Sequence, residues 1–236
     1  MAVAGLARLS TCDWPGRLAA TVFLQGCPWD CVYCHNPDLI DARAPGTIPW
    51  PDVLAFLRRR QGLLDGVVFS GGEPTRSPGL AEAIDAVRGL GLGVGLHTAG
   101  AFPNRLSAVL GRVDWVGLDI KALPADYPAV VGRPGSGERA WRSLGLLLSS
   151  GVEHEVRTTV HPGSAAADRL PEIVRRLSAL GVRSFALQEA RATGARDGFR
   201  ADAAGWSAQL RALASAAAAA GFERFELRRV EYLVPD

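Results

Sequence analysis

The feature that most constrains the fold is a regular alternation of short apolar runs with longer segments of helical spacing. Each of six apolar runs is followed by one such segment, the order of a β-strand and the helix that crosses back over the sheet. Units of this kind in series build parallel sheets with right-handed connections. The predicted strands cover 19–24, 66–70, 94–98, 115–120, 153–160 and 184–188, the predicted helices 51–64, 80–90, 104–110, 138–150, 169–180 and 202–220, and a last strand 224–229.

Six units are too few to close an eight-fold barrel. We therefore predict an α/β fold, a partial (β/α)6 TIM-like barrel of parallel strands, with a flavodoxin-like open sheet as the alternative. The length of 236 residues suits one domain spanning 1–236.

Composition bears on the partners and the compartment. The net charge of +2 gives no reason to expect nucleic acid or an anionic membrane as a partner. No apolar run reaches the roughly 18 residues that a membrane span needs, and the residues 1–5 lack the pattern of a signal peptide. We expect a cytoplasmic protein, where clustered cysteines more often bind metals than form disulfides.

Three of the four cysteines lie within eight residues, directly after the predicted strand 19–24. Cys27, Cys31 and Cys34 have the spacing C-x3-C-x2-C. Three thiolates can hold a [4Fe–4S] cluster and leave one iron open to a small molecule. Cys12 is a buried free thiol or, as an alternative, a fourth ligand. A structural zinc is the other alternative, although Cys31 and Cys34 form the only C-x2-C pair.

Polar residues also follow the other predicted strands at their carboxyl ends. Carboxyl ends of parallel strands meet at one edge, where β/α folds build their sites. The candidates are Gly71, Gly72, Glu73, Pro74, His97, Thr98, Asp119, Lys121, Arg157, Thr159, His161 and Gln188. Lys121 is the only lysine among 26 basic residues, and a position that keeps lysine in such a chain can require a compact ammonium.

The cysteine motif, with Tyr33 before its last cysteine, resembles the signature of radical S-adenosylmethionine (SAM) enzymes. This resemblance implies a [4Fe–4S] cluster on Cys27, Cys31 and Cys34, with the amino and carboxylate groups of SAM on the fourth iron. One electron from the cluster would then cleave SAM to a 5′-deoxyadenosyl radical. Tyr33 would lie against the adenine.

Further segments resemble motifs of the same family. Residues 71–74 resemble the GGEP motif, whose carboxylate, here Glu73, accepts from the SAM ammonium. Asp119-Ile120-Lys121 resembles a D-x-K motif whose lysine meets the SAM carboxylate. The remaining residues match ligand-side positions: Thr98 after the third strand, where His97 replaces an aspartate of related activases, Arg157 and Thr159 on the fifth, and Gln188 near the nucleoside.

Over nearly the whole chain the resemblance is strongest to activating proteins of anaerobic ribonucleotide reductase, followed by pyruvate formate-lyase activating enzyme. The segments that carry it are 10–16, 23–26 and 34–37. It implies a glycyl-radical enzyme as partner and a flavodoxin- or ferredoxin-type electron donor. A radical SAM enzyme acting on a small molecule, and a non-catalytic Fe–S or zinc module, are the alternatives.

Overall fold

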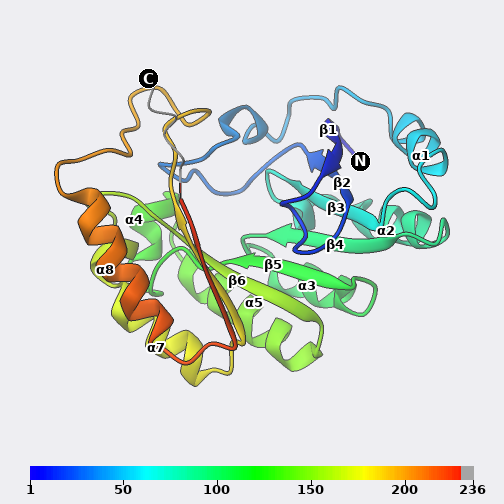
Figure 1. Ribbon diagram of the computed structural model, residues 1–236. Helices are drawn as coiled ribbons and strands as arrows, with labels where there is room; N and C mark the ends of the chain where they lie inside the picture. Colours follow the sequence, from blue (N-terminus) through cyan, green and yellow to red (C-terminus); the bar gives the residue numbers. More distant parts are fainter. Residues whose placement is uncertain (230–236) are drawn as a thin grey trace, which may run out of the picture.

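The structure is a computed structural model and describes residues 1–229. Its centre is one eight-stranded sheet whose strands follow one another in chain order (Figure 1). The edge strand β1 (Val3–Ser10) is antiparallel to β2, and all later neighbours are parallel. The parallel strands are β2 (Ala19–Leu24), β3 (Gly66–Gly71), β4 (Gly93–Thr98), β5 (Trp115–Asp119), β6 (Glu153–Val160), β7 (Ser184–Glu189) and β8 (Arg224–Arg228).

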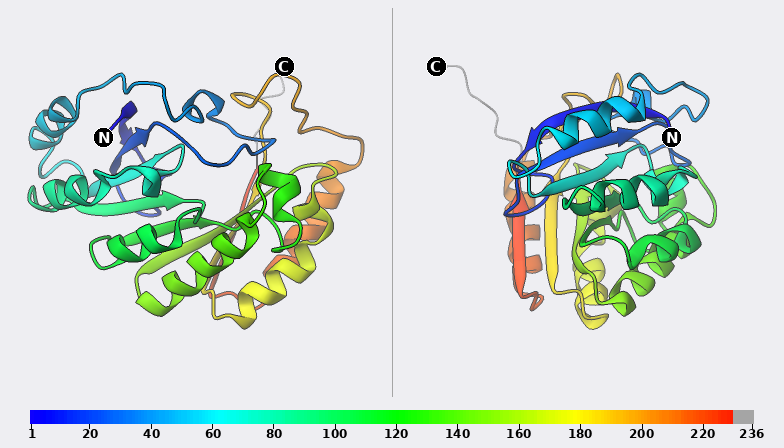
Figure 2. Two further views of the ribbon diagram at one scale, coloured as in Figure 1. Left: turned by 180° about the vertical axis from the view of Figure 1, so that it is seen from behind. Right: turned by 90° about the vertical axis from the view of Figure 1, so that its right-hand side faces the viewer.

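The sheet curves into a partial barrel with its helices on the outer face (Figure 2). The sequential strand order confirms the partial barrel and excludes the flavodoxin-like alternative, in which the order doubles back. The helices are α1 (Trp50–Arg58), α2 (Leu80–Arg88), α3 (Pro103–Leu110), α4 (Tyr127–Val131), α5 (Ser136–Ser150), α6 (Ala165–Asp168), α7 (Leu170–Ala179) and α8 (Trp206–Ala218), with short 3-10 turns η1 (Pro37–Leu39) and η2 (Pro74–Arg76).

Helix α7 shows why these segments fold onto the sheet. Its buried residues Leu170, Ile173, Val174 and Leu177 recur at the spacing of one helix face. No helix within residues 1–229 is long and apolar enough to cross a membrane.

Several elements differ from the sequence prediction, and one of them is α8, which covers Trp206–Ala218 instead of 202–220. Strand β1 was not predicted, because most of its residues are only half-buried and carry no clear alternation. Helix α1 ends at Arg58 instead of continuing to residue 64, and Gly62 follows with a φ of 77°. The short helices α4 and α6 were missed, since five and four residues give no periodic signal.

The loop that joins β1 to β2 fills the barrel interior at the amino ends of the parallel strands. This loop carries Trp14, which stacks on Trp115 with ring centroids 6.0 Å apart. A Cβ atom at Gly66, Gly93 or Gly95 would lie only 2.8, 3.2 or 3.1 Å from the Trp14 ring. Gly66 in β3 and Gly93 and Gly95 in β4 therefore leave the space that this indole occupies. The site lies at the opposite, carboxyl edge.

Candidate functional site

The three clustered cysteines occupy an irregular loop, residues 26–36, directly after β2. The Cys27 N–H donates to the Ile40 carbonyl at 3.1 Å, and the Cys34 N–H donates to the Cys31 carbonyl at 3.1 Å. Cys31 is buried, the other two are half-buried, and all three are free thiols. The loop thus presents three thiols at the carboxyl edge of the sheet.

Burial is the main influence on the pKa values of the Cys27 and Cys31 thiols. It raises the pKa of Cys27 to about 12; the charges of Glu73 and Cys31 add to the rise, while the Trp29 N–H and the Lys121 ammonium oppose it. Burial raises the pKa of Cys31 as well. Both thiols are protonated at neutral pH on their own, and a bound metal must displace the protons to obtain thiolate ligands.

Within residues 1–229, no three His, Cys, Asp or Glu side chains lie close enough together to hold one metal ion. Cys12 is exposed beside the Ser10 hydroxyl, 3.4 Å away, and the loop that carries it lies at the other end of β2 from Cys27. The prediction of a buried Cys12 is wrong, because the loop turns Trp14 inward and leaves Cys12 outside.

The glycines of the segment 71–74 are required by backbone packing. Gly71 has a φ of 117°, and a Cβ there would lie 2.3 Å from the Leu24 nitrogen. A Cβ on Gly72 would lie 2.5 Å from the carbonyl oxygen of Gly26. This close fit seats Glu73, whose N–H donates to the same Gly26 carbonyl at 3.0 Å, immediately beside the cysteine loop. Pro74 then opens the turn η2.

The Glu73 carboxylate is fully buried and its two oxygens are unequally used. Oε1 accepts from the N–H and hydroxyl of Thr75 at 3.1 and 2.5 Å and from the Thr98 hydroxyl at 2.7 Å. Oε2 accepts from the Ala99 N–H at 2.9 Å. Burial raises the pKa of Glu73 in spite of these bonds. Oε2 has room for a further donor, and Thr98 acts on this site through Glu73.

Asp119, Lys121 and Tyr33 come together beside the cysteines. The Lys121 Nζ donates to Asp119 Oδ2 at 2.9 Å and lies 5.7 Å from the centre of the Tyr33 ring. Burial opposes the charge of Lys121, but Asp119, Tyr33 and Cys31 raise its pKa well above the ordinary value. Burial also acts to raise the pKa of Asp119, which Lys121 and Arg157 nevertheless hold below its usual range. A fixed ammonium therefore stands next to the thiols.

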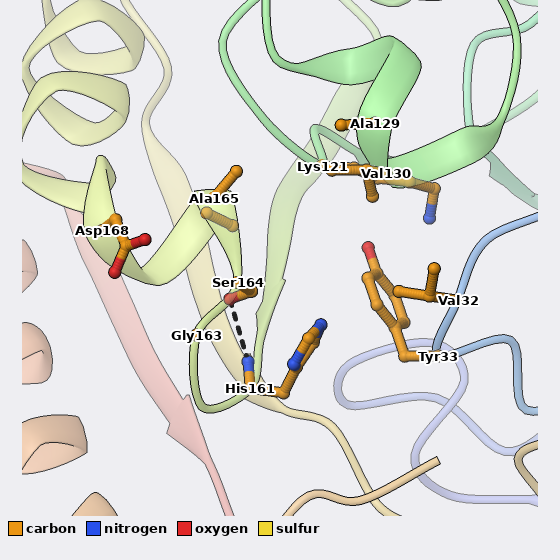
Figure 3. A pocket seen from close by; sticks show the side chains of 11 residues that line it. Val32, Tyr33, Lys121, Ala129, Val130, His161, Gly163, Ser164, Ala165 and Asp168 are labelled. Carbon is orange, nitrogen blue, oxygen red and sulfur yellow. Dashed lines mark hydrogen bonds between the residues drawn. The ribbon is translucent and has the colours of Figure 1, made fainter. Parts of the chain in front are cut away.

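A cavity of about 320 Å³ adjoins this group (Figure 3). Its walls include Lys121, Tyr33, Val32 from the cysteine loop, Val130 from α4 and the segment 161–168 after β6. The Tyr33 hydroxyl is buried and has no hydrogen-bond partner among the described residues. A buried polar group left unpaired costs about 1–3 kcal/mol, so this hydroxyl points to a ligand.

Arg157 lies one layer deeper, inside the barrel. It belongs to a group of five side chains that we call the buried charge network: Asp13, His97, Glu155, Arg157 and Arg228. Arg157 Nε donates to Glu155 Oε1 at 2.8 Å, and Arg228 donates to both Glu155 oxygens at 2.8 and 2.9 Å. Arg157 also lies over the Trp115 ring, 5.2 Å from its centre.

His97 closes the buried charge network toward the β1–β2 loop. Its Nε2 lies 2.7 Å from the Asp13 carbonyl oxygen and 3.1 Å from Arg157 Nη2. Burial, with the charge of Arg157, depresses the pKa of His97 to about 3, so the imidazole is neutral. His97 is therefore an interior packing residue, and the structure gives Arg157 protein partners; its predicted contact with a cofactor stays a prediction.

Thr159 and Gln188 are neighbours in register on β6 and β7. Both are half-buried on the inner face near the carboxyl edge. The sequence had identified both as candidates and had also noted His161 as a strand-end residue. The structure adds contacts of His161 that the sequence could not reveal. Its ring meets those of Tyr33 and Phe199 edge to face, with centroids 5.7 and 5.1 Å apart.

With this geometry in view, comparisons with known proteins define the class. Residues 21–177 match the model of the radical SAM superfamily, and this chain belongs to that superfamily. Enzymes of this class use a [4Fe–4S] cluster and SAM. Three thiols without a fourth nearby, a buried unpaired hydroxyl and an adjoining cavity fit these two groups.

Two curated relatives are named as activating enzymes. MJ1227 of Methanocaldococcus jannaschii, whose name describes a glycyl-radical enzyme activating enzyme, is 28% identical over 183 residues, 73% of this chain and 74% of its own. The pyruvate formate-lyase-activating enzyme of Clostridium pasteurianum is 31% identical over 157 residues, 64% of each chain.

A solved structure shares the fold. SuiB of Streptococcus suis, crystallised with SAM, matches 89% of this chain at a TM-score of 0.67 and 14% identity. This chain spans about half the length of SuiB, 49%. The likeness therefore concerns the barrel alone.

Proposed function

We propose that this chain is a cytoplasmic glycyl-radical-enzyme activase, one domain over 1–236, whose partner is anaerobic ribonucleotide reductase. Pyruvate formate-lyase is the second candidate partner, favoured by the relative from Clostridium pasteurianum. The observation that carries the SAM chemistry is the set of three thiols, Cys27, Cys31 and Cys34, beside the fixed ammonium of Lys121, and the relatives named as activating enzymes support a glycyl-radical enzyme as partner. A flavodoxin- or ferredoxin-type protein would supply the electron.

The chemistry that the two cofactors supply when bound is the one-electron reductive cleavage of SAM, which leads to abstraction of a hydrogen atom from a glycine. In this proposal Cys27, Cys31 and Cys34 would hold the cluster and leave one position on it open for SAM. Three ligands rather than four are what this role requires, since a fully ligated cluster has no open position.

The residues around the cysteines orient SAM. Lys121 is a permanent cation that pairs with the SAM carboxylate, and its bond to Asp119 holds it in place. Glu73 Oε2, which accepts one hydrogen bond from the described part of the chain, accepts from the SAM ammonium. No side chain of the chain needs to transfer a proton in this reaction.

Other residues shape the rest of the SAM site. Tyr33 and Gln188 hold the nucleoside, with the Tyr33 hydroxyl gaining the partner that it lacks within the protein. Thr98 fixes the Glu73 carboxylate. The backbone of Gly71, Gly72 and Pro74 presents Glu73 to the ligand, Thr159 completes the wall at β6, and Arg157 supports that wall from one layer deeper.

The test is transfer of a radical to a partner protein. The chain is reconstituted anaerobically with iron and sulfide, reduced, and mixed with SAM and either the anaerobic reductase or pyruvate formate-lyase. We expect the electron paramagnetic resonance (EPR) doublet of a glycyl radical in the reductase, lost when its glycine is replaced by alanine. A doublet in the lyase alone would reassign the partner, and SAM cleavage without a radical in either protein would refute the activase.

A further inference from the structure

One aromatic pair links the cysteine loop to Asp119 and Lys121, and neither ring has a role in the proposed reaction. Trp29 and Tyr127 are both fully buried. Their rings meet edge to face, with centroids 5.7 Å apart and planes at 64°. Trp29 lies between two of the cysteines, and Tyr127 begins α4, so the contact joins the two halves of the candidate site.

The Tyr127 hydroxyl holds the segment that carries the ion pair. It accepts the Lys121 N–H at 2.9 Å and lies 3.4 Å from the Asp119 carbonyl oxygen, to which it donates. Ile120 still donates to the Arg157 carbonyl of the neighbouring strand at 2.8 Å. The next N–H in the chain, that of Lys121, bonds to the Tyr127 hydroxyl instead of to a carbonyl of a neighbouring strand. Extended backbone places side chains two residues apart on one side, the geometry that the Asp119–Lys121 ion pair needs.

The same short helix seats the cysteine loop. The Asp30 N–H donates to the Val131 carbonyl at 3.0 Å, and Arg133 Nε donates to the Pro28 carbonyl at 3.3 Å. The residues between Cys27 and Cys31 are thus fixed against α4 and the turn that follows it.

We propose that Trp29 and Tyr127 form a positioning unit that fixes the Lys121 ammonium relative to the three cysteine sulfurs. The proposal rests on the proposed function, because the role of Lys121 toward SAM is taken from it. A helix of five residues has little stability of its own. The buried ring contact therefore holds α4 in place, and α4 in turn transmits the position of one half of the site to the other.

The test compares Tyr127→Phe, Lys121→Ala and the double variant, each reconstituted anaerobically. Tyr127→Phe keeps the buried ring and removes only the hydroxyl. We expect unchanged iron per chain and SAM binding weakened about 3- to 10-fold, the effect of one lost hydrogen bond. Since Tyr127 acts through Lys121, the hydroxyl should have no further effect in the Lys121→Ala background. Equal weakening in both backgrounds, or wild-type affinity in Tyr127→Phe, would overturn the positioning unit.

Trp29 gives a second arm. Trp29→Leu removes the ring contact and should weaken SAM binding by a similar factor, whereas Trp29→Phe keeps an aromatic edge and should restore most of the affinity. Phe222→Leu is the control, because it removes an aromatic contact with Phe185, with centroids 5.0 Å apart, at the amino end of β7 and away from the site. Should Trp29→Leu fail to fold, the Tyr127 series decides alone.

EPR of the reduced cluster separates the two proposals. In the wild-type chain, SAM should change the cluster signal, and Tyr127→Phe should need more SAM for the same change. A wild-type signal that does not respond to SAM contradicts the proposed function. A wild-type response that Tyr127→Phe reproduces at the same SAM concentration contradicts the positioning unit alone.

Discussion

The interior of the barrel holds two polar layers that differ in how completely the protein satisfies them. In the buried charge network, Glu155 accepts three hydrogen bonds from Arg157 and Arg228. One layer higher, the Tyr33 hydroxyl is buried without a partner among the described residues. The lower layer is closed by protein groups, and the upper layer is left open on the side of the cysteines.

This difference separates residues that maintain the fold from residues that await a ligand. A buried ion pair is costly to break, because removal of one partner leaves the other charge buried without compensation. Buried polar groups without partners destabilise the free protein and gain their partners on binding. Changes in the lower layer should therefore lower the stability of the cofactor-free protein, and changes in the upper layer should act on cofactor binding.

The largest effect is expected from Cys31→Ala. Loss of one of three thiolates leaves too few ligands for a cluster, so bound iron and all SAM cleavage should be lost after reconstitution. Iron and sulfide assays with the visible spectrum check this. Cys12→Ala is the control, since its exposed thiol lies at the other edge of the sheet, and it should bind iron like the wild type. Iron loss in Cys12→Ala would contradict the ligand set.

Arg157→Met should have the next largest effect, on folding. It leaves Glu155 buried with one partner fewer, which costs about 3–5 kcal/mol and lowers the melting temperature by roughly 10 °C. Thermal unfolding of the cofactor-free protein measures this. Arg112→Met breaks an exposed pair with Asp85 and should cost less than about 1 kcal/mol. A stable Arg157→Met protein that no longer binds SAM would move Arg157 into the cofactor site.

Lys121→Met should weaken SAM binding about 10- to 100-fold, the loss of one charged hydrogen bond. The cluster should assemble normally, because the cysteines are untouched. Isothermal titration of the reconstituted protein with SAM gives the dissociation constant. Lys121→Arg keeps the charge but in a larger, planar group, so its affinity for SAM should lie between those of the wild type and Lys121→Met. Unchanged affinity in Lys121→Met would remove this residue from the site.

The smallest effect expected is a dependence of stability on pH through His97. Burial depresses its pKa to about 3, below the ordinary 6.5. Below pH 6.5 the unfolded chain therefore binds a proton that the folded chain does not, and stability falls. The loss at pH 5.5 relative to pH 7 is about 1.3 kcal/mol. Denaturant unfolding at both pH values should show a shallower dependence in His97→Gln, and an identical dependence would contradict the buried neutral imidazole.

The sequence was sufficient for the partial barrel because each β–α unit has its own periodic signal. It also placed Cys27, Cys31 and Cys34 and the Asp119–Lys121 pair at one edge, since strand ends in a parallel sheet meet there. Strand β1 escaped prediction because it is antiparallel, half-buried and without alternation. The short helix α4 escaped because its five residues carry no period.

Contacts between distant residues account for what else was missed. The role of Trp14 could not be predicted, because its indole packs against three glycines that only the folded sheet brings together. Tyr127 has no motif of its own; only the folded chain reveals that its hydroxyl bonds the backbone at Lys121. Arg157 looked like a strand-end residue, and the pairing with Glu155 on the same strand required knowledge of which face points inward.

The central claim is that the upper layer is completed by a cluster and SAM. The most direct measurement is to reduce the reconstituted wild-type protein anaerobically in the presence of SAM and then to quantify methionine and 5′-deoxyadenosine. We predict a brown protein with one cluster per chain that forms the two products in equal amounts and stops doing so in Cys31→Ala. A colourless zinc protein, or a cluster protein that leaves SAM intact after reduction, would contradict it.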